Sequence, residues 1–202
     1  MRMLRLLSVL VCGVGLFYAS ASKAESVEKE HDGLYFRLNA GPSYMSWSNS
    51  GNSDLSVSGM GFGFGLAAGH TISDNLMLFA EFAMDSFSEP TAKVKDTELD
   101  MKDTSMSATR YGAGVSYYLM PLNGYVTGSL LLGSFSTTTG SVSDSSKTGF
   151  GLKVGVGKEW MLAPKFGLGA ALSGTYLTAG DKEGSESSSA MLYGLSLSAT
   201  YN

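Results

Sequence analysis

Cysteine is nearly absent from this sequence: the single residue, Cys12, lies in an uncharged apolar stretch near the N-terminus. We expect this stretch to be removed during secretion, which leaves a mature chain without a thiol. Disulfide bonds, cysteine nucleophiles and cysteine metal sites are then excluded together. Histidine is also scarce, with His31 and His70 as the only two residues of this type, so candidates for a catalytic base are few.

Residues 1–24 have the features of a secretory signal peptide. Arg2 and Arg5 supply a positive start, residues 6–18 are apolar, and small residues precede the cleavage that we expect after Ala24. The apolar run is shorter than the roughly 18–20 residues that a spanning helix needs, which favours a cleaved signal over a membrane anchor. Residues 25–32 are charged and are predicted to form a short periplasmic leader.

Positive charge is scarce once the signal peptide is removed. Loss of Arg2, Arg5 and Lys23 leaves 11 basic and 18 acidic residues, a net charge of −7. Nucleic-acid binding depends on basic patches, so we expect no nucleic-acid partner. The remaining length suits one domain, which we place at residues 33–202.

Long apolar runs are missing from this domain, and an alternation with a period of two takes their place. Phe62, Phe64 and Leu66, for example, alternate with glycine and alanine. Successive residues of a strand point to opposite faces, so each such stretch has one apolar face and one small or polar face. Eight stretches share the pattern, at residues 33–46, 58–70, 75–87, 105–119, 124–136, 148–160, 165–178 and 190–201.

The connections between the eight stretches alternate in length. They are short at residues 70–75, 120–124 and 160–165, and long and polar at 47–57, 88–104, 137–147 and 179–189. Outer-membrane barrels have short periplasmic turns and long external loops. The sequence therefore predicts an all-β fold, an eight-stranded antiparallel up-and-down transmembrane β-barrel in the bacterial outer membrane, with both termini periplasmic. Short alternations around Val94 and Leu99 predict a hairpin within the second long loop.

The apolar face is present on all eight predicted strands, whereas the other face is mostly glycine and serine with a few charges. We expect an interior lined by glycine and serine rather than by large apolar side chains. Such an interior is a poor core for a soluble protein but suits a barrel whose apolar face contacts lipid. The glycines of residues 58–70 are expected to make room for Tyr35, Arg37 and Phe79 to point inward from the neighbouring strands. A soluble lipocalin-like carrier, with its apolar face inward, is the alternative.

Several charged residues fall on the predicted inner face. Glu81 and Asp85 share a face of one strand, and Arg110 lies beside both on the neighbouring strand. Interior charges of a sealed barrel are satisfied by pairing, so we predict a structural ion-pair network in the lumen rather than acid–base chemistry. Its further predicted members are Arg37, Lys153 and Glu159.

Aromatic residues gather near the predicted strand ends, as in the two aromatic girdles of outer-membrane barrels. The predicted periplasmic girdle contains Tyr35, Tyr117, Trp160, Phe166 and Tyr201, and the predicted outer girdle contains Tyr44, Trp47, Phe87, Phe135 and Tyr176.

Catalytic, cofactor and metal sites are not predicted. Hydrolysis or acyl transfer on outer-leaflet lipid needs a nucleophile beside a base, and both histidines are predicted at the periplasmic end. The carboxylates of residues 96–103 lack the spacing of an EF-hand loop. The glycines of residues 61–65 alternate within a strand rather than opening a helix, so a dinucleotide site is excluded.

The segments Leu34–Tyr44, Gly61–Gly69, Leu76–Met84 and Tyr111–Tyr118 resemble the small eight-stranded outer-membrane proteins of the opacity and adhesion/invasion type. The resemblance implies a non-enzymatic, porin-like barrel acting in envelope integrity or adhesion through its loops. It also implies contact with outer-membrane lipid and lipopolysaccharide, an extracellular loop partner, and assembly by the barrel-assembly machinery, which reads a C-terminal aromatic such as Tyr201. A narrow channel, a hydrophobic-ligand transporter and, least favoured, a lipid-modifying enzyme stay open as alternatives.

Overall fold

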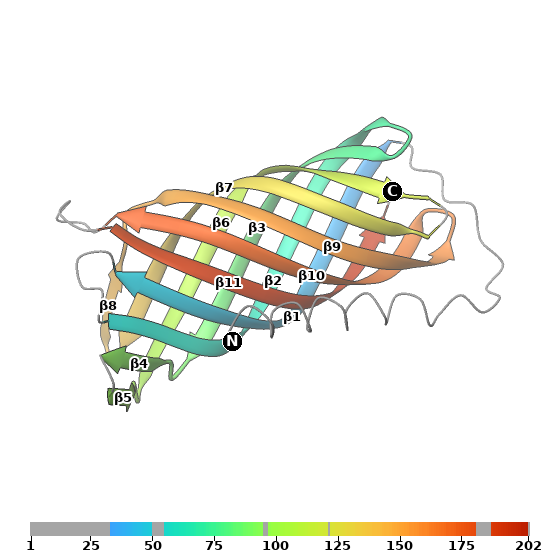
Figure 1. Ribbon diagram of the computed structural model, residues 1–202. Coiled ribbons are helices and arrows are strands. Elements are labelled where there is room, and N and C mark those ends of the chain that lie inside the picture. Colours follow the sequence, from blue (N-terminus) through green and yellow to red (C-terminus); the bar gives the residue numbers. More distant parts are fainter. Residues whose placement is uncertain (1–32, 50–54, 95–96, 121, 181–186, 202) are drawn as a thin grey trace, which may run out of the picture.

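The computed structural model describes residues 33–49, 55–94, 97–120, 122–180 and 187–201. The signal peptide and leader predicted at residues 1–32 lie outside these ranges. Eight long antiparallel strands close into a barrel, which confirms the predicted fold (Figure 1). They are β1 (Leu34–Asn49), β2 (Leu55–Ser73), β3 (Leu76–Ser88), β6 (Thr104–Leu119), β7 (Gly124–Thr139), β9 (Gly149–Ala163), β10 (Phe166–Gly180) and β11 (Ser187–Tyr201).

Closure of the barrel comes from β1, which pairs with both β2 and β11. Arg37 of β1 lies opposite Ala67 of β2 on one side and Thr200 of β11 on the other. Every wall strand thus has two neighbours, so the wall has no open edge. Leu34 and Tyr201 lie at the same end of the barrel as the short connections, which we call the turn end. The opposite end is called the hairpin end.

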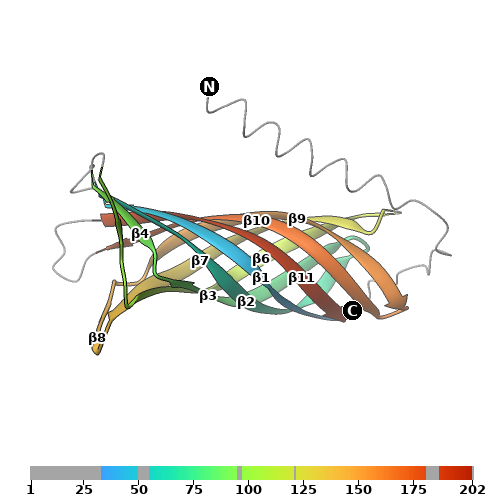
Figure 2. The same ribbon diagram turned by 90° about the horizontal axis from the view of Figure 1, so that it is seen from below.

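Three short strands stand at the hairpin end, far from the C-terminus (Figure 2). They are β4 (Thr91–Val94) and β5 (Thr97–Asp100), which pair with each other, and β8 (Val142–Ser145), which pairs with β7. The hairpin predicted around Val94 and Leu99 is confirmed. Several wall strands also run further toward this end than predicted, because pairing satisfies backbone groups even where polar residues hide the alternation.

The β4–β5 hairpin extends the wall along β2. β3 pairs with β2 as far as Phe87 opposite Gly61, and β4 resumes the pairing with Thr91 opposite Ser58. Glu89 adopts a positive φ of 48° at the break, and Pro90 is fully buried there. Proline lacks an N–H and fits best where a ladder is interrupted, so these two residues mark the step from β3 to β4.

The outer surface is apolar, as the inside-out pattern predicted. On β1, the side chains of Leu34, Phe36 and Leu38 are 60%, 48% and 54% exposed, whereas those of Tyr35 and Arg37 between them are 1% and 8% exposed. An exposed apolar face of this kind, repeated on every wall strand, suits contact with lipid hydrocarbon. No helix among the described residues is long and apolar enough to cross a membrane.

The interior departs from the prediction, because both of its ends contain large apolar side chains. The turn-end cluster consists of Tyr35, Ala67, Met77, Phe79, Tyr118 and Tyr125. The hairpin-end cluster consists of Met45, Val57, Phe87, Met106, Ala108, Phe135, Leu177, Ala179, Ala190 and Leu192. The expectation of a lumen without large apolar residues was therefore wrong. Glycine dominates the inner faces of β2 and β9, and the other strands bring larger residues inward near their ends.

Inward glycines are the positions where other groups approach the wall most closely. A Cβ at Gly63 would meet the carboxylate of Asp85, and one at Gly65 would lie 2.7 Å from the side-chain oxygen of Asn39. At Gly112 the obstacle is the backbone of β7, around Leu130 and Leu131. Small residues at these points let large or charged side chains fill a narrow interior.

Gly112→Ala is expected to destabilise the barrel by about 1–3 kcal/mol, because its methyl group would press on the backbone of β7, which cannot rotate away. Gly128→Ala is the matched control, since nothing lies within 4 Å of its Cβ position, and it should change stability by less than about 1 kcal/mol. Urea unfolding in lipid vesicles, followed by heat-modifiable gel mobility, measures both. Equal stability of the two variants would contradict the close approach at Gly112.

Candidate functional site

The interior contains three ion pairs, one among the rings of the turn-end cluster and two further toward the hairpin end. Nearest the turn end, Arg37 of β1 pairs with Glu159 of β9 at 2.7 Å. In the middle, Lys153 of β9 pairs with Glu81 of β3 at 2.5 Å. Nearest the hairpin end, Arg110 of β6 pairs with Asp85 of β3. All six charged side chains named from the sequence thus lie inside the barrel and take part in ion pairs.

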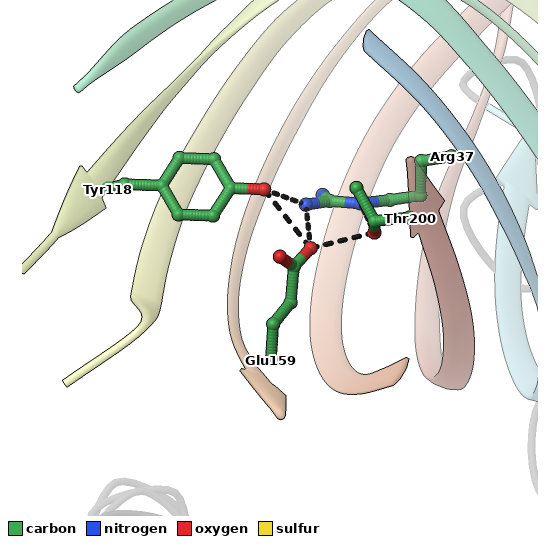
Figure 3. Close-up of polar contacts among 4 residues, drawn as sticks. All are labelled: Arg37, Tyr118, Glu159 and Thr200. Carbon is green, nitrogen blue, oxygen red and sulfur yellow. Dashed lines mark hydrogen bonds and ion pairs between the residues drawn. The ribbon is translucent and has the colours of Figure 1, made fainter. Parts of the chain in front are cut away.

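Arg37 and Glu159 form the most extensively bonded of these pairs (Figure 3). Arg37 Nη2 donates to Glu159 Oε1 at 2.7 Å and to the Tyr118 hydroxyl at 2.6 Å. Its Nε donates to Thr200 Oγ1 at 3.2 Å. The hydroxyls of Tyr118 and Thr200 in turn donate to Glu159 Oε1, at 3.0 Å and 2.7 Å. The four side chains come from β6, β1, β9 and β11, so this cluster ties strands across the whole lumen.

Aromatic rings enclose the Arg37 guanidinium. Its central carbon lies 4.0 Å from the centroid of the Tyr125 ring and 5.2 Å from that of Tyr35. Cation–π attraction of this kind is strongest where the cation is desolvated. The guanidinium and the rings together close the turn end of the lumen.

The pairing differs from the predicted network in one respect. Arg110 binds Asp85 and also donates from Nη1 to Thr175 Oγ1 at 3.1 Å. The carboxylate of Glu81, predicted to share Arg110, instead accepts from Lys153 Nζ, which reaches it from β9. Alternation along a strand tells which face a residue occupies, but the choice of partner depends on distances across the lumen.

Sequence reasoning missed the neutral partners Tyr118, Thr175 and Thr200. The alternation had placed Thr175 and Thr200 on the small, polar face of their strands, but not as partners of the charges. The alternation relative to Arg110 could also have placed Tyr118 on the inner face. Their hydroxyls satisfy charged groups that a single ion pair leaves partly unbonded.

The predicted aromatic girdles need four corrections. Tyr35, Phe87 and Phe135 are buried inside the barrel, and Trp47 packs against the hairpin-end cluster. These residues were assigned from their nearness to strand ends, although Tyr35 and Trp47 share the inward position of Arg37 in the alternation. The other predicted members are exposed on the outer surface: Tyr44, Tyr117, Trp160, Phe166, Tyr176 and Tyr201.

Two small cavities lie between the apolar clusters, with volumes of about 60 and 50 Å³. Both are lined by Asn39, Lys153, Ser173 and Ser196, so they meet around Lys153. Their size suits a few water molecules and falls far below the roughly 300 Å³ of an ordinary small-molecule site. Within the described residues, one carboxylate oxygen of Glu81 near the first cavity has no hydrogen-bond partner, as expected for a wet polar interior.

Glu81, Asp85 and Glu159 each bind a cation. His70 is exposed, with its Nδ1 2.6 Å from the Thr71 carbonyl oxygen. Among the described residues, no group of three or more His, Cys, Asp or Glu side chains could hold a metal ion.

Comparison with known proteins identifies the class to which this barrel belongs. The family model of the outer membrane protein beta-barrel domain matches residues 9–201, so the chain belongs to that family, whose members reside in the bacterial outer membrane. No curated protein matches the sequence.

The solved structures of Neisserial surface protein A and AlkL share the fold of this barrel. Neisserial surface protein A is 20% identical with a TM-score of 0.62, over 84% of this chain and 97% of that protein. The outer membrane protein AlkL is 15% identical with a TM-score of 0.52, over 90% and 95% of the two chains. The attachment invasion locus protein Ail of Yersinia pestis is 14% identical with a TM-score of 0.49, over 84% and 99%.

A double-mutant cycle should report the observed pairing. Arg110→Met is expected to destabilise the barrel by about 3–5 kcal/mol, because it leaves the buried Asp85 carboxylate without its cation. Combined with Asp85→Asn, it should show a coupling energy above about 1 kcal/mol. Combined with Glu81→Gln, it should show much weaker coupling. Urea unfolding in lipid vesicles measures these energies, and stronger coupling to Glu81 would favour the network predicted from sequence.

Proposed function

We propose that this protein is a non-enzymatic barrel of the outer membrane that strengthens the envelope and presents its hairpin end as a surface for adhesion or other surface interaction. The observation that carries the proposal is the contrast between a filled interior and a hairpin end built of paired strands. Binding and catalytic residues are found disproportionately on loops held by a rigid scaffold. The hairpins are accordingly the part of this barrel available for recognition.

The packing of the β4–β5 hairpin supports this proposal. Ala92 and Met101 pack against the hairpin-end cluster, and the Met101 N–H donates to the Pro90 carbonyl oxygen at 3.1 Å. The hairpin is therefore braced by the barrel core. A braced surface loses less entropy on binding than a mobile loop.

The proposed orientation places the hairpin end outside the cell and both termini in the periplasm, following the loop-length asymmetry of outer-membrane barrels. The exposed apolar belt would then contact outer-membrane lipid and lipopolysaccharide. We further propose that the barrel-assembly machinery inserts the chain through its last strand, β11, which has the aromatic Tyr201 at its end.

The interior argues against the alternative functions. Clusters of large side chains close both ends of the lumen, which disfavours a channel, and the cavities are too small for a transported hydrophobic molecule. An enzyme is disfavoured because the interior carboxylates are held in ion pairs. The exposed apolar belt argues against the soluble lipocalin-like carrier, since soluble monomers rarely present a large apolar surface to water.

The purified protein is expected to show no steady ion conductance in planar bilayers, because side chains from both apolar clusters and the Arg37–Glu159 pair fill the lumen. Single-channel recording checks this, with a wide porin in the same bilayer as the positive control. Long-lived, regular conductance steps that require this protein would contradict the sealed interior and revive the channel alternative.

Surface attachment is expected to depend on the β4–β5 hairpin. In the trimmed variant, Asn-Gly replaces Ala92–Leu99. Thr91 and Asp100 already lie opposite each other, so the two new residues connect them by a favoured two-residue turn. The trimmed protein should fold and insert normally, as judged by heat-modifiable gel mobility. Cells that display it should attach to surfaces less than cells with the full-length protein.

Protease treatment of intact cells provides the topology control for this variant. Cleavage within residues 88–104 of the full-length protein should be lost in the trimmed variant. Protection of this region until the outer membrane is opened would reverse the proposed orientation. Unchanged attachment by the trimmed cells would remove the hairpin from the adhesive surface.

A further inference from the structure

The β4–β5 hairpin has two chemically distinct faces. The strand register places β2, β4 and β5 side by side, so residues in the same row share a face. One face carries the rows Leu55–Val94–Thr97 and Val57–Ala92–Leu99. The other carries the rows Ser56–Lys93–Glu98 and Ser58–Thr91–Asp100. The hairpin is therefore amphipathic across its width.

The apolar face changes from buried to exposed across the three strands. Val57 of β2 belongs to the hairpin-end cluster and is 6% exposed, and Ala92 of β4 packs against the same cluster. Leu99 of β5, in the same row, is 56% exposed, and Val94 in the next row is 39% exposed. The core of the barrel thus continues into an apolar surface that no described residue of the chain covers fully.

β5 is also the terminal strand of this part of the sheet, since it pairs only with β4 among the described strands. The Met101 N–H donates to the Pro90 carbonyl oxygen at 3.1 Å, so the pair next to Thr91–Asp100 in the ladder is a hydrogen-bonded one. Hydrogen-bonded and non-bonded pairs alternate in an antiparallel ladder, so the backbone N–H of Glu98 points to the free edge. An edge of this kind can accept another strand.

The charge at the free edge is acidic. Glu98 and Asp100 lie in adjacent rows on the polar face of β5. Lys93 Nζ lies 3.7 Å from Glu98 Oε1, with both side chains largely exposed. Such a surface pair contributes little and leaves the carboxylates accessible. A strand added beside β5 would meet acidic groups on one face and apolar groups on the other.

We propose that the edge of β5 binds an extended polypeptide segment of a partner protein, in which basic residues alternate with apolar ones. Backbone hydrogen bonds to β5 would hold the segment, its apolar side chains would cover Val94 and Leu99, and its basic side chains would face Glu98 and Asp100. This inference rests on the proposed surface function and names the chemistry of the partner.

Two other occupants are disfavoured. A second copy of this chain, pairing β5 with β5, would bring like charges into opposition, which destabilises a strand pair. The chain's own segments 50–54 and 181–186 consist of polar and charged residues and glycine, so they offer no apolar side chain to cover Leu99.

The test uses the full-length protein in nanodiscs of neutral phosphatidylcholine, which do not attract a basic peptide. The probe is a capped peptide of alternating lysine and valine, about eight residues long so that it spans the edge. Controls are a peptide with the same residues in two blocks and one with glutamate in place of lysine. Binding is followed by hydrogen exchange of the Glu98 amide. Only the alternating lysine peptide should protect this amide, and less so at high salt.

Three variants separate the contributions to binding. Glu98→Pro removes the edge N–H without removing a bond to β4, and should weaken peptide binding about tenfold or more. Glu98→Gln keeps the N–H and should mainly reduce the salt dependence. Ser143→Pro is the matched control on β8, the other short edge strand, where Ser143 occupies the corresponding position opposite Thr138, and it should leave binding unchanged.

The outcomes distinguish this inference from the proposed function. Equal binding of the alternating and blocked peptides, or unchanged binding by Glu98→Pro, would overturn docking at the β5 edge and mark Glu98 and Asp100 as charges that protect an edge from aggregation. If trimming the hairpin still lowered attachment of cells, the surface function would stand without this docking mode. If trimming had no effect while the peptide still bound β5 selectively, the hairpin would remain a docking site and the adhesive role would fail.

Discussion

A lipid bilayer offers no hydrogen bonds to the backbone, and this constraint governs the structure. Strands within a membrane must pair on both sides, so the sheet has to close. The sheet closes through β1, which pairs with β2 and β11. The distribution of side chains is the reverse of that in a soluble protein. The apolar face of every wall strand points outward, and the polar groups are enclosed in a narrow lumen. The remaining features follow from how this lumen is filled.

Charges in the lumen are costly unless they are paired and hydrogen-bonded. Three ion pairs at successive levels meet this requirement, and hydroxyls such as Tyr118 and Thr200 complete the bonding of the Arg37–Glu159 pair. The Arg37–Glu159 and Lys153–Glu81 pairs join strands far apart around the wall and brace the barrel across its lumen. The Arg110–Asp85 pair joins the neighbouring strands β6 and β3. The two apolar clusters exclude solvent from the ends. An interior filled in this way favours stability, and the recognition surface that we propose lies at the hairpin end.

The hairpin end combines rigidity with exposed binding groups. The wall continues beyond the break at Glu89 and Pro90 as β4 and β5, and the apolar core follows it through Val57 and Ala92 to the exposed Leu99. The position of Leu99 beside a free, acidic strand edge supports a role in binding an extended partner, and the rigid barrel beneath keeps this edge in place.

Local alternation in the sequence by itself determined the strands, the lipid-facing residues and the inward position of all six interior charges, because side-chain direction in a strand depends only on the position of the residue. It also located the hairpin around Val94 and Leu99. The tertiary structure alone decided that Glu81 binds Lys153 rather than Arg110, and that Met45, Phe87 and Leu177 converge in one cluster. These contacts depend on the stagger of the strands and on distances across the lumen, which no local pattern contains.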